Sequence, residues 1–147
     1  NNLFFLPNFT KNYLFIKSRI IHQRSSFRNS KIAYTCGSGY KYPVRKLFEI
    51  PASKTAMILY GNKNYRKLGF IDGRNCIFSD PSDIVKEVRL LLNKKKIREN
   101  LVKDCFKMIL DNHTLDVRVN NLLICLKMIL KNNFNFAKFE NGKYIIS

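Results

Sequence analysis

The first 48 residues of the chain contain no aspartate and no glutamate. They carry nine lysine and arginine residues, whereas the rest of the chain carries 18 basic and 10 acidic side chains with the two signs mixed. An unbalanced basic segment of this kind favours an acidic partner, an anionic membrane surface or a phosphate-bearing ligand. A solvated basic face is the alternative, because lysine and asparagine are abundant throughout the sequence.

Long apolar runs are also missing. The longest, LLICLKMIL at residues 122–130, is interrupted by Lys127 and falls short of the roughly 18 residues that a membrane span requires. The leading NNLFFLP lacks the basic start of a signal peptide. With 147 residues and 46% hydrophobic content, the sequence indicates one globular domain, or part of one, rather than a disordered chain.

Cysteine is sparse and unpaired in the sequence. Cys36, Cys76, Cys105 and Cys125 form no CxxC pair, and no cysteine–histidine spacing matches a zinc site. We therefore expect free thiols in a reducing, cytoplasmic setting. Cys105 and Cys125 fall on apolar helical faces, where a free cysteine acts as a small hydrophobic residue.

Short apolar segments alternate with helical patterns along the chain. The patterns predict a basic helical lead-in within 10–28 and strands at 31–36, 55–60 and 75–78. They also predict helices from Pro43, from Asp80-Pro81, at 95–111 and from Thr114, with a short helix or turn at 63–69. Gly37, Ser38 and Gly39 form a small-residue turn after the first strand. Strands alternating with helices are typical of an α/β layered sheet.

The last helices carry apolar stripes that favour burial against the sheet. We expect the inward residues of the helix that Thr114 caps to be Leu115, Val119, Leu122, Leu123, Leu126, Ile129 and Leu130. The adjacent pair Asn141-Gly142 then predicts a small hairpin in the tail.

Four motifs in this order resemble a known family. KYPVRKLFEIPASKTAMILY, KLGFIDGRNCIF, the helix DPSDIVKEVRLLL and HTLDVR resemble the C-terminal half of a GT-B glycosyltransferase. The resemblance covers about residues 31–130 and is nearest to the group-1 domain of the spore-maturation (CgeB-like) type. It implies a Rossmann-like α/β fold with a short parallel sheet flanked by helices and a C-terminal helical segment. It divides the chain into a lead-in (1–30), a nucleotide-sugar-binding domain (31–131) and a tail (132–147).

The resemblance also implies a binding site. The family pattern R-x-x-F-E matches Arg45, Phe48 and Glu49, which makes Glu49 the ligand of the donor's ribose hydroxyls. A carboxylate suits this role because it accepts strong, charge-assisted hydrogen bonds from both hydroxyls. Arg45 lies one helical turn earlier, so it can reach a diphosphate or pair with Glu49 or Asp72. The turn at Gly37, Ser38 and Gly39 would let backbone N–H groups approach a phosphate or sugar.

The sequence departs from the family pattern at two positions. Lys54 stands where many members have glycine, which questions a close approach of the ligand there. Lys41 stands where related retaining enzymes carry a second glutamate, so a two-glutamate mechanism does not carry over. His113, in the HTxxxR pattern, favours a capping or packing role, and Arg118 is expected to pair with Asp111 or another acid.

The resemblance implies the donor-binding part of a glycosyltransferase that uses a nucleotide-diphosphate sugar and serves polysaccharide or glycoconjugate synthesis. It also implies that the enzyme needs no bound metal and no cofactor. A missing N-terminal Rossmann-like domain would present a glycan or protein acceptor. The protein would be cytoplasmic, with peripheral contact to a membrane through its basic front. A basic nucleic-acid-binding module and an inactive glycosyltransferase fragment are the alternatives. Nucleic acid is the less favoured partner because the aromatic residues lie in apolar contexts.

Overall fold

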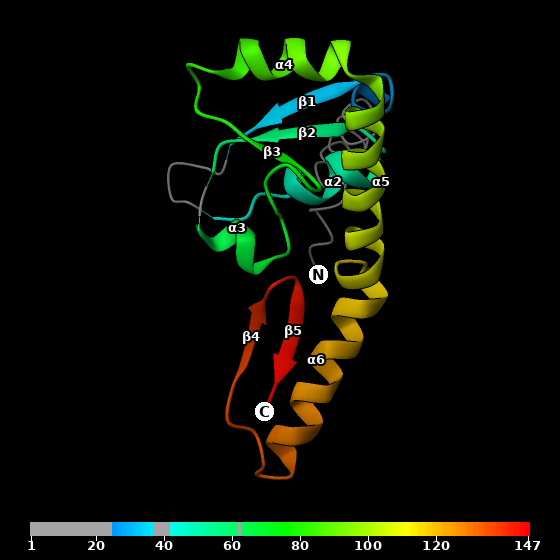
Figure 1. Cartoon of the computed structure of the whole chain (residues 1–147). Coiled ribbons are helices and arrows are strands. Elements are labelled where there is room, and N and C mark those ends of the chain that lie inside the picture. Colours follow the sequence, from blue (N-terminus) through cyan, green and yellow to red (C-terminus); the bar gives the residue numbers. More distant parts are fainter. Residues whose placement is uncertain (1–24, 37–41, 62) are drawn as a thin grey trace, which may run out of the picture.

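The computed structural model describes residues 25–36, 42–61 and 63–147. The elements follow in this order: β1 (Ile32–Thr35), α2 (Lys46–Ala52), β2 (Ala56–Leu59), α3 (Lys63–Lys67), β3 (Ile77–Phe78), α4 (Ile84–Asn93), α5 (Lys95–Asn112), α6 (Leu115–Leu130), β4 (Ala137–Glu140) and β5 (Lys143–Ile146). Figure 1 shows an α/β unit formed by the elements from β1 to α5, and below it a long helix, α6, beside a hairpin. Of the predicted basic lead-in, only residues 25–28 of the described part are helical.

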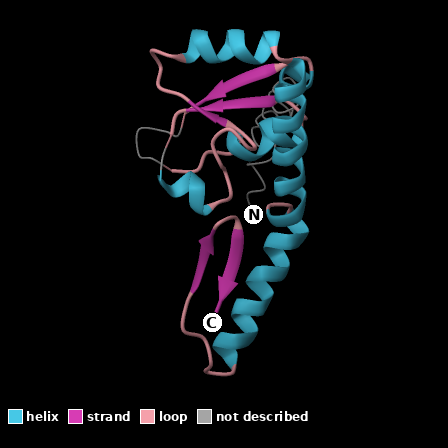
Figure 2. Cartoon of the chain, in the orientation of Figure 1, coloured by secondary structure: helices cyan, strands magenta, loops and turns pink. Residues whose placement is uncertain are grey.

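The α/β unit is built on a parallel sheet of three strands in the order β1-β2-β3. Ile32 pairs with Ala56, and Ile58 pairs with Ile77. All four residues of the central strand are buried, which is the pattern of a strand covered on both faces. The predicted short parallel sheet flanked by helices is therefore confirmed (Figure 2).

The side chains of β2 alternate between two cores, as the twofold period of a strand requires. Met57 and Leu59 join a cluster with residues of α2, α3 and α5, whereas Ala56 and Ile58 pack with Leu91. Leu91 belongs to α4, which covers the sheet on the other side (Figure 1). The helix α5 contributes residues to both clusters.

The helix α2 begins at Lys46, three residues later than the predicted start at Pro43. Its end is closed by two backbone bonds, from the N–H of Lys54 to the carbonyl of Pro51 and from the N–H of Thr55 to the carbonyl of Ile50. This is the Schellman arrangement, which places the residue after the helix in the left-handed region. That residue is Lys54, whose φ is +59°.

The other helix starts were predicted with mixed success. Thr114 caps α6 as expected, because its hydroxyl accepts from the N–H of Val117 at 3.4 Å. Asp80 does not cap α4, since that helix begins three residues after Pro81, at Ile84. The carbonyl of Asp80 instead accepts from the N–H of Asp83 in a preceding turn.

No helix in the described part of the chain combines the length and apolarity needed to cross a bilayer.

The expectation for the inner face of α6 was wrong. The seven residues predicted to point inward are between 44% and 83% exposed, and Cys125 is the only described residue of this helix that is buried. The reason is visible in Figure 1, where α6 runs beyond the α/β unit and, of the described elements, the hairpin alone lies along it. Cys125 faces that hairpin, with its sulfur 3.6 Å from the hydroxyl of Tyr144.

The predicted hairpin is confirmed and is fastened to the α/β unit. Asn141 and Gly142 both have positive φ, +50° and +84°, which is the geometry of a type I′ turn. The N–H of Gly142 donates to the carbonyl of Lys67 at 2.9 Å. A Cβ built on Gly69 would lie 2.9 Å from the Cα of Gly142, so this contact tolerates no side chain.

Candidate functional site

Parallel strands place their carboxyl ends at one edge of the sheet, and open α/β sheets bind ligands outside that edge. In this chain β1 ends at Thr35, β2 at Leu59 and β3 at Phe78. The segments that leave this edge lead into α2, α3 and α4. The first turn of α2 and the whole of α3 are therefore the elements best placed to form a site.

Arg45 and Glu49 come together at the start of α2. Nε of Arg45 lies 3.0 Å from Oε1 of Glu49 across one helical turn. The side chain of Arg45 is 59% exposed and that of Glu49 only 16%, so the carboxylate is the inner member of the pair. Of the pairings open to Arg45, the structure forms the one with Glu49. Asp72 instead accepts a hydrogen bond from the N–H of Phe78.

The second carboxylate oxygen of Glu49 has an unusual environment. Oε2 is buried and, within the described part of the chain, has no hydrogen-bond partner. A buried acceptor without a donor costs free energy, and most such groups in folded proteins are paired. Glu49 therefore presents one oxygen fixed by Arg45 and one with unused capacity to accept a hydrogen bond.

Gly37, Ser38 and Gly39 lie outside the described residues, and so does Lys41. Their predicted contact with a phosphate or sugar stays a prediction. The strand before them and the Arg45–Glu49 pair after them are both described.

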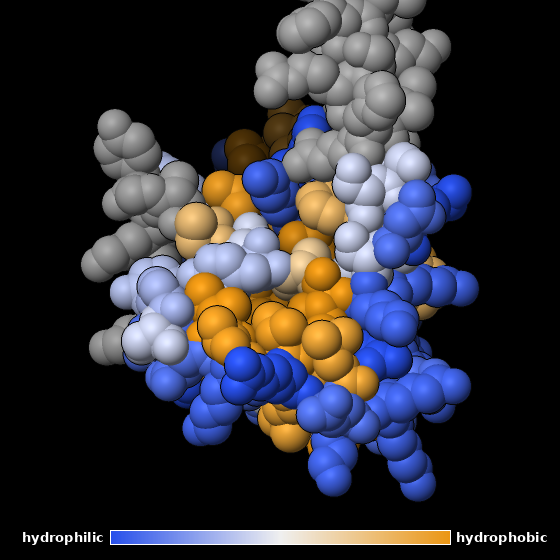
Figure 3. Space-filling model, turned by 90° about the horizontal axis from the view of Figure 1, so that it is seen from above, coloured by the Kyte–Doolittle hydropathy of each residue, from blue (hydrophilic) through white to orange (hydrophobic). Residues whose placement is uncertain are grey.

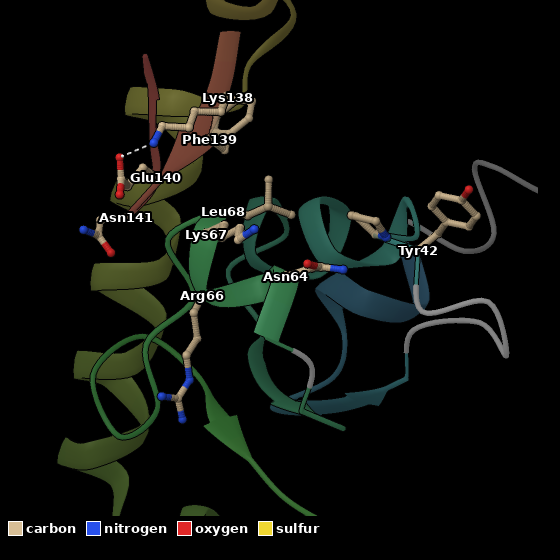
Figure 4. Close-up of a pocket in the computed structure, with 10 residues that line it drawn as sticks. Tyr42, Asn64, Arg66, Lys67, Leu68, Lys138, Phe139, Glu140 and Asn141 are labelled. Carbon is tan, nitrogen blue, oxygen red and sulfur yellow. Dashed lines mark ion pairs between the residues drawn. The ribbon is translucent and has the colours of Figure 1, made fainter. Parts of the chain in front are cut away.

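A cavity of about 870 Å³ opens beside α3. Its walls come from three places: Tyr42 and Pro43 ahead of α2, residues of α3 with Leu68, and the turn of the hairpin. Figure 4 shows Tyr42 on one side of this space and Lys138, Glu140 and Asn141 on the other, with Asn64, Lys67 and Leu68 between them. Arg45 and Glu49 are not among the described residues that line it.

The lining of this cavity carries more positive than negative charge. Lys138 pairs with Glu140 at 3.2 Å, which leaves Lys67 and Arg66 as the excess cations. Arg66 extends away from the hairpin toward β3 and lies over the ring of Phe78 at 5.8 Å (Figure 4). The cavity thus offers a lysine and the amides of Asn64 and Asn141, which can bind hydroxyl or phosphate oxygens.

The sequence analysis missed these lining residues. Asn64 and Lys67 belong to a short helix that was predicted without any role, and Asn141 belongs to a hairpin that was predicted without a location. The Asn-Gly signal was visible, but docking of the hairpin depends on the Gly69–Gly142 contact, which joins segments 73 residues apart (142 minus 69).

His113 has the packing role that its sequence context favours. Its Nε2 lies 2.7 Å from the carbonyl of Leu68, and its Nδ1 lies 3.0 Å from a guanidinium nitrogen of Arg118. Its ring lies between those of Phe48 and Phe139, with centroids 5.1 and 5.6 Å away. The histidine therefore joins the α5–α6 junction to both α2 and the hairpin.

The expected pairing of Arg118 with an acid was wrong. Asp111 pairs with Lys107 at 3.0 Å, and Arg118 instead donates to His113 and lies 4.2 Å over the ring of Phe139. Burial lowers the pKa of His113, and the charge of Arg118 lowers it further, against an opposing effect of the bond to Leu68.

The cysteines are free, and three of them are buried, as expected for small hydrophobic residues. Burial raises the pKa of Cys105 to about 12 and also raises that of Cys76, so neither thiol is an activated nucleophile. The described residues contain no group of three or more histidine, cysteine or acidic side chains that could hold a metal ion.

A cavity and the Arg45–Glu49 pair thus lie beyond the carboxyl edge of a parallel sheet, the edge outside which open α/β sheets bind their ligands. Comparison with known families identifies the family of the chain. The model of the glycosyl transferase-like family matches residues 21–124, which is more than two thirds of the sequence, and the chain belongs to this family. No curated protein and no solved structure matches the chain.

Proposed function

We propose that the chain is the donor-binding portion of a GT-B glycosyltransferase of the spore-maturation type, and that its ligand is a nucleotide-diphosphate sugar. Membership of the glycosyl transferase-like family supports glycosyl transfer in general. The parallel sheet, with polar groups gathered beyond its carboxyl edge, is consistent with nucleotide binding.

The observation that carries the proposal is the state of the Glu49 carboxylate. Arg45 holds Oε1, while Oε2 is buried and lacks a donor among the described residues. The two hydroxyls of a ribose would supply the missing donors, and hydrogen bonds to a carboxylate are about twice as strong as neutral ones. In this proposal Glu49 fixes the nucleoside and Arg45 orients Glu49.

The reaction would break the bond between the anomeric carbon and the diphosphate and form a bond from that carbon to the oxygen of an acceptor hydroxyl. The proton of that hydroxyl would pass to a base on the acceptor side or to water. The leaving diphosphate carries the negative charge, so nearby cations favour its departure. We assign the cavity beside α3 to the sugar end of the donor, because Asn64, Lys67 and Asn141 can bind hydroxyl and phosphate oxygens. The acceptor, a glycan or protein, would be presented by a second Rossmann-like domain, in the cytoplasm or at a membrane surface.

Calorimetric titration with UDP, GDP and ADP tests this proposal. We expect one of the three to bind the wild-type chain, and Glu49→Ala to weaken that binding about 100-fold, the loss expected for strong hydrogen bonds to a charged group. Glu87→Ala is the matched control, since Glu87 also lies in the first turn of a helix. That variant should bind like the wild type.

Two results would contradict the proposal. Nucleotide binding of equal strength in Glu49→Ala and the wild type would remove the role of the carboxylate. An RNA that outcompetes every nucleotide would instead support the nucleic-acid-binding alternative. Because Glu49 contributes an unpaired buried oxygen, its replacement should leave the melting temperature near that of the wild type, so loss of folding does not obscure the outcome.

A further inference from the structure

A second cavity, of about 490 Å³, lies at the opposite end of α2 from the Arg45–Glu49 pair. Lys31, just before β1, and Lys54, just before β2, contribute from the amino edge of the sheet. Arg98 and Lys103 contribute from α5. This cavity therefore lies away from the carboxyl edge and shares no lining residue with the cavity beside α3.

The charges around this cavity are unbalanced. Lys31, Lys54, Arg98 and Lys103 face a single acid, Glu99, whose carboxylate lies 3.7 Å from Lys95 on the same helix. Cations gathered around one space repel one another, and a bound anion relieves that repulsion.

Two of these cations are held in place by the fold. Nη1 of Arg98 donates to the carbonyls of Leu91 and Leu92 at 2.6 and 3.3 Å, which fixes the guanidinium at the end of α4. Nζ of Lys54 lies 5.1 Å from the centroid of the Phe106 ring, within the range of a cation–π contact. A preorganised cation loses less conformational entropy when a ligand binds.

Lys54 also stands at a position whose backbone conformation favours glycine. Its φ of +59° lies in the left-handed region, where glycine is the least costly residue. A non-glycine residue there costs free energy, and Lys54 is exposed, with its ammonium group over Phe106. Ligand binding by the ammonium group in the cavity would be a reason for a lysine at this position despite that cost.

We propose that this cavity binds the phosphate groups of a small organic phosphate. Lys54, Arg98 and Lys103 contact the phosphate oxygens, and an apolar part of the ligand lies over Val102 and Phe106, the apolar residues of the lining. The volume is within the range of small-molecule sites. This site is separate from the proposed donor site and does not depend on it.

The test is titration of the full chain with pyrophosphate at low ionic strength, in the wild type and three variants. Lys54→Gly removes one cation and relieves the left-handed strain, so this variant should fold at least as stably as the wild type. Lys103→Ala removes a second cation of the cavity. Lys107→Ala is the matched control, one helical turn further along α5 and outside the cavity.

We expect Lys54→Gly and Lys103→Ala each to raise the dissociation constant of pyrophosphate about tenfold, and Lys107→Ala to change it less than about twofold. Because pyrophosphate could also bind at the donor site, the readout is the difference between Lys103→Ala and Lys107→Ala. Equal effects of these two variants, or binding that is insensitive to Lys54→Gly, would overturn the proposal.

A second arm identifies the source of the phosphate. Phosphatidylcholine vesicles with and without phosphatidic acid are compared as ligands of the same variants. Binding to the acidic vesicles that requires Lys54 and Lys103 but not Lys107 assigns the phosphate to a lipid headgroup. Selective losses for pyrophosphate alone assign it to a soluble molecule. Vesicle binding that all three variants weaken equally, without selective loss for pyrophosphate, would show diffuse charge attraction and contradict the site.

Discussion

Lys54 shows how one backbone angle explains a difference from a family pattern. The glycine that many related domains carry at this position suggested close approach of a ligand. The structure gives a backbone reason instead, because the residue follows α2 in a Schellman arrangement with φ of +59°. A glycine at this position would therefore suit the end of α2, and the side chain of Lys54 lines the cavity at the amino edge of the sheet.

His113 is held in one tautomer by its two partners. The carbonyl of Leu68 can only accept a hydrogen bond, so Nε2 carries the proton and Nδ1 accepts from Arg118. Protonation of Nδ1 would break the bond to Arg118 and place two cations side by side. The lowered pKa of His113 has the same physical basis, since burial and the nearby guanidinium both disfavour the charged ring.

The lowered pKa of His113 predicts a loss of stability in mild acid. The unfolded chain takes up the proton near the ordinary value of 6.5, whereas the folded chain takes it up at lower pH. This contribution to stability is complete above pH 6.5 and declines as the pH falls below it, by at most about 1.4 kcal/mol per pH unit. Urea unfolding between pH 7.5 and 5.5 should show the decline in the wild type.

His113→Gln supplies the control, because its amide can still donate to the Leu68 carbonyl but does not titrate. The variant should be less stable than the wild type at pH 7.5, and the difference should shrink toward pH 5.5. A difference that is constant over this range would contradict the assigned protonation state.

At the scale of elements, periodicity predicted which segments form helices and strands but not what covers them. The run at 56–59 became the central strand, and α5 buried Leu101, Cys105 and Ile109 along one face. The pattern of α6 was equally apolar, yet its residues are exposed because the helix extends past the sheet. An apolar stripe predicts a face, and the covering layer depends on tertiary placement that one sequence window does not contain.

The helix α4 gives a second example. Leu91 is buried under it, whereas Val85 and Leu92 are 61% and 50% exposed on its outer side. Figure 3 shows the resulting apolar patch over α4, bordered by hydrophilic residues. Adjacent helical residues are about 100° apart, so Leu91 reaches the sheet and Leu92 does not.

Because α5 is buried and α6 is exposed, replacing a leucine by alanine should lower the free energy of unfolding more on α5 than on α6. Leu101→Ala, on α5, should lower the free energy of unfolding by about 2 to 4 kcal/mol, since Leu101 is 1% exposed in the core. Leu122→Ala, on α6, should change it by less than about 0.5 kcal/mol, since Leu122 is 57% exposed. Denaturant unfolding of the two variants measures both. A cost for Leu122→Ala that matches that of Leu101→Ala would show that α6 is packed.

At the scale of the whole molecule, contacts between residues close in the sequence could be predicted, whereas contacts between distant segments could not. The Arg45–Glu49 pair was one of the predicted alternatives, because a spacing of four residues on a helix brings two side chains together. The cavity beside α3 was not predicted, because its walls come from residues 42–43, 64–68 and 138–141, which only the complete fold assembles. The docking of the hairpin onto α3 and the ring stack around His113 are the long-range contacts involved.

The distribution of charge also has meaning only at this scale. The net charge of +17 suggested several anionic partners, but the sequence did not locate where any of them would bind. The fold gathers cations at two separate places, beside α3 and at the amino edge of the sheet. Each place can be tested by single substitutions with a neighbouring control, which separates a specific site from the general attraction of a basic protein for anions.

The central claim is that Glu49 binds the ribose hydroxyls of a nucleotide. It is tested most directly by removing the carboxylate and the hydroxyls, separately and together. Calorimetry would compare a nucleoside diphosphate with its 2′,3′-dideoxy analogue, using the wild type and Glu49→Ala. We predict that the wild type prefers the complete nucleotide by tenfold or more, as expected for hydrogen bonds to a charged group, and that Glu49→Ala binds both equally. A preference for the hydroxyls that survives undiminished in Glu49→Ala would contradict the account.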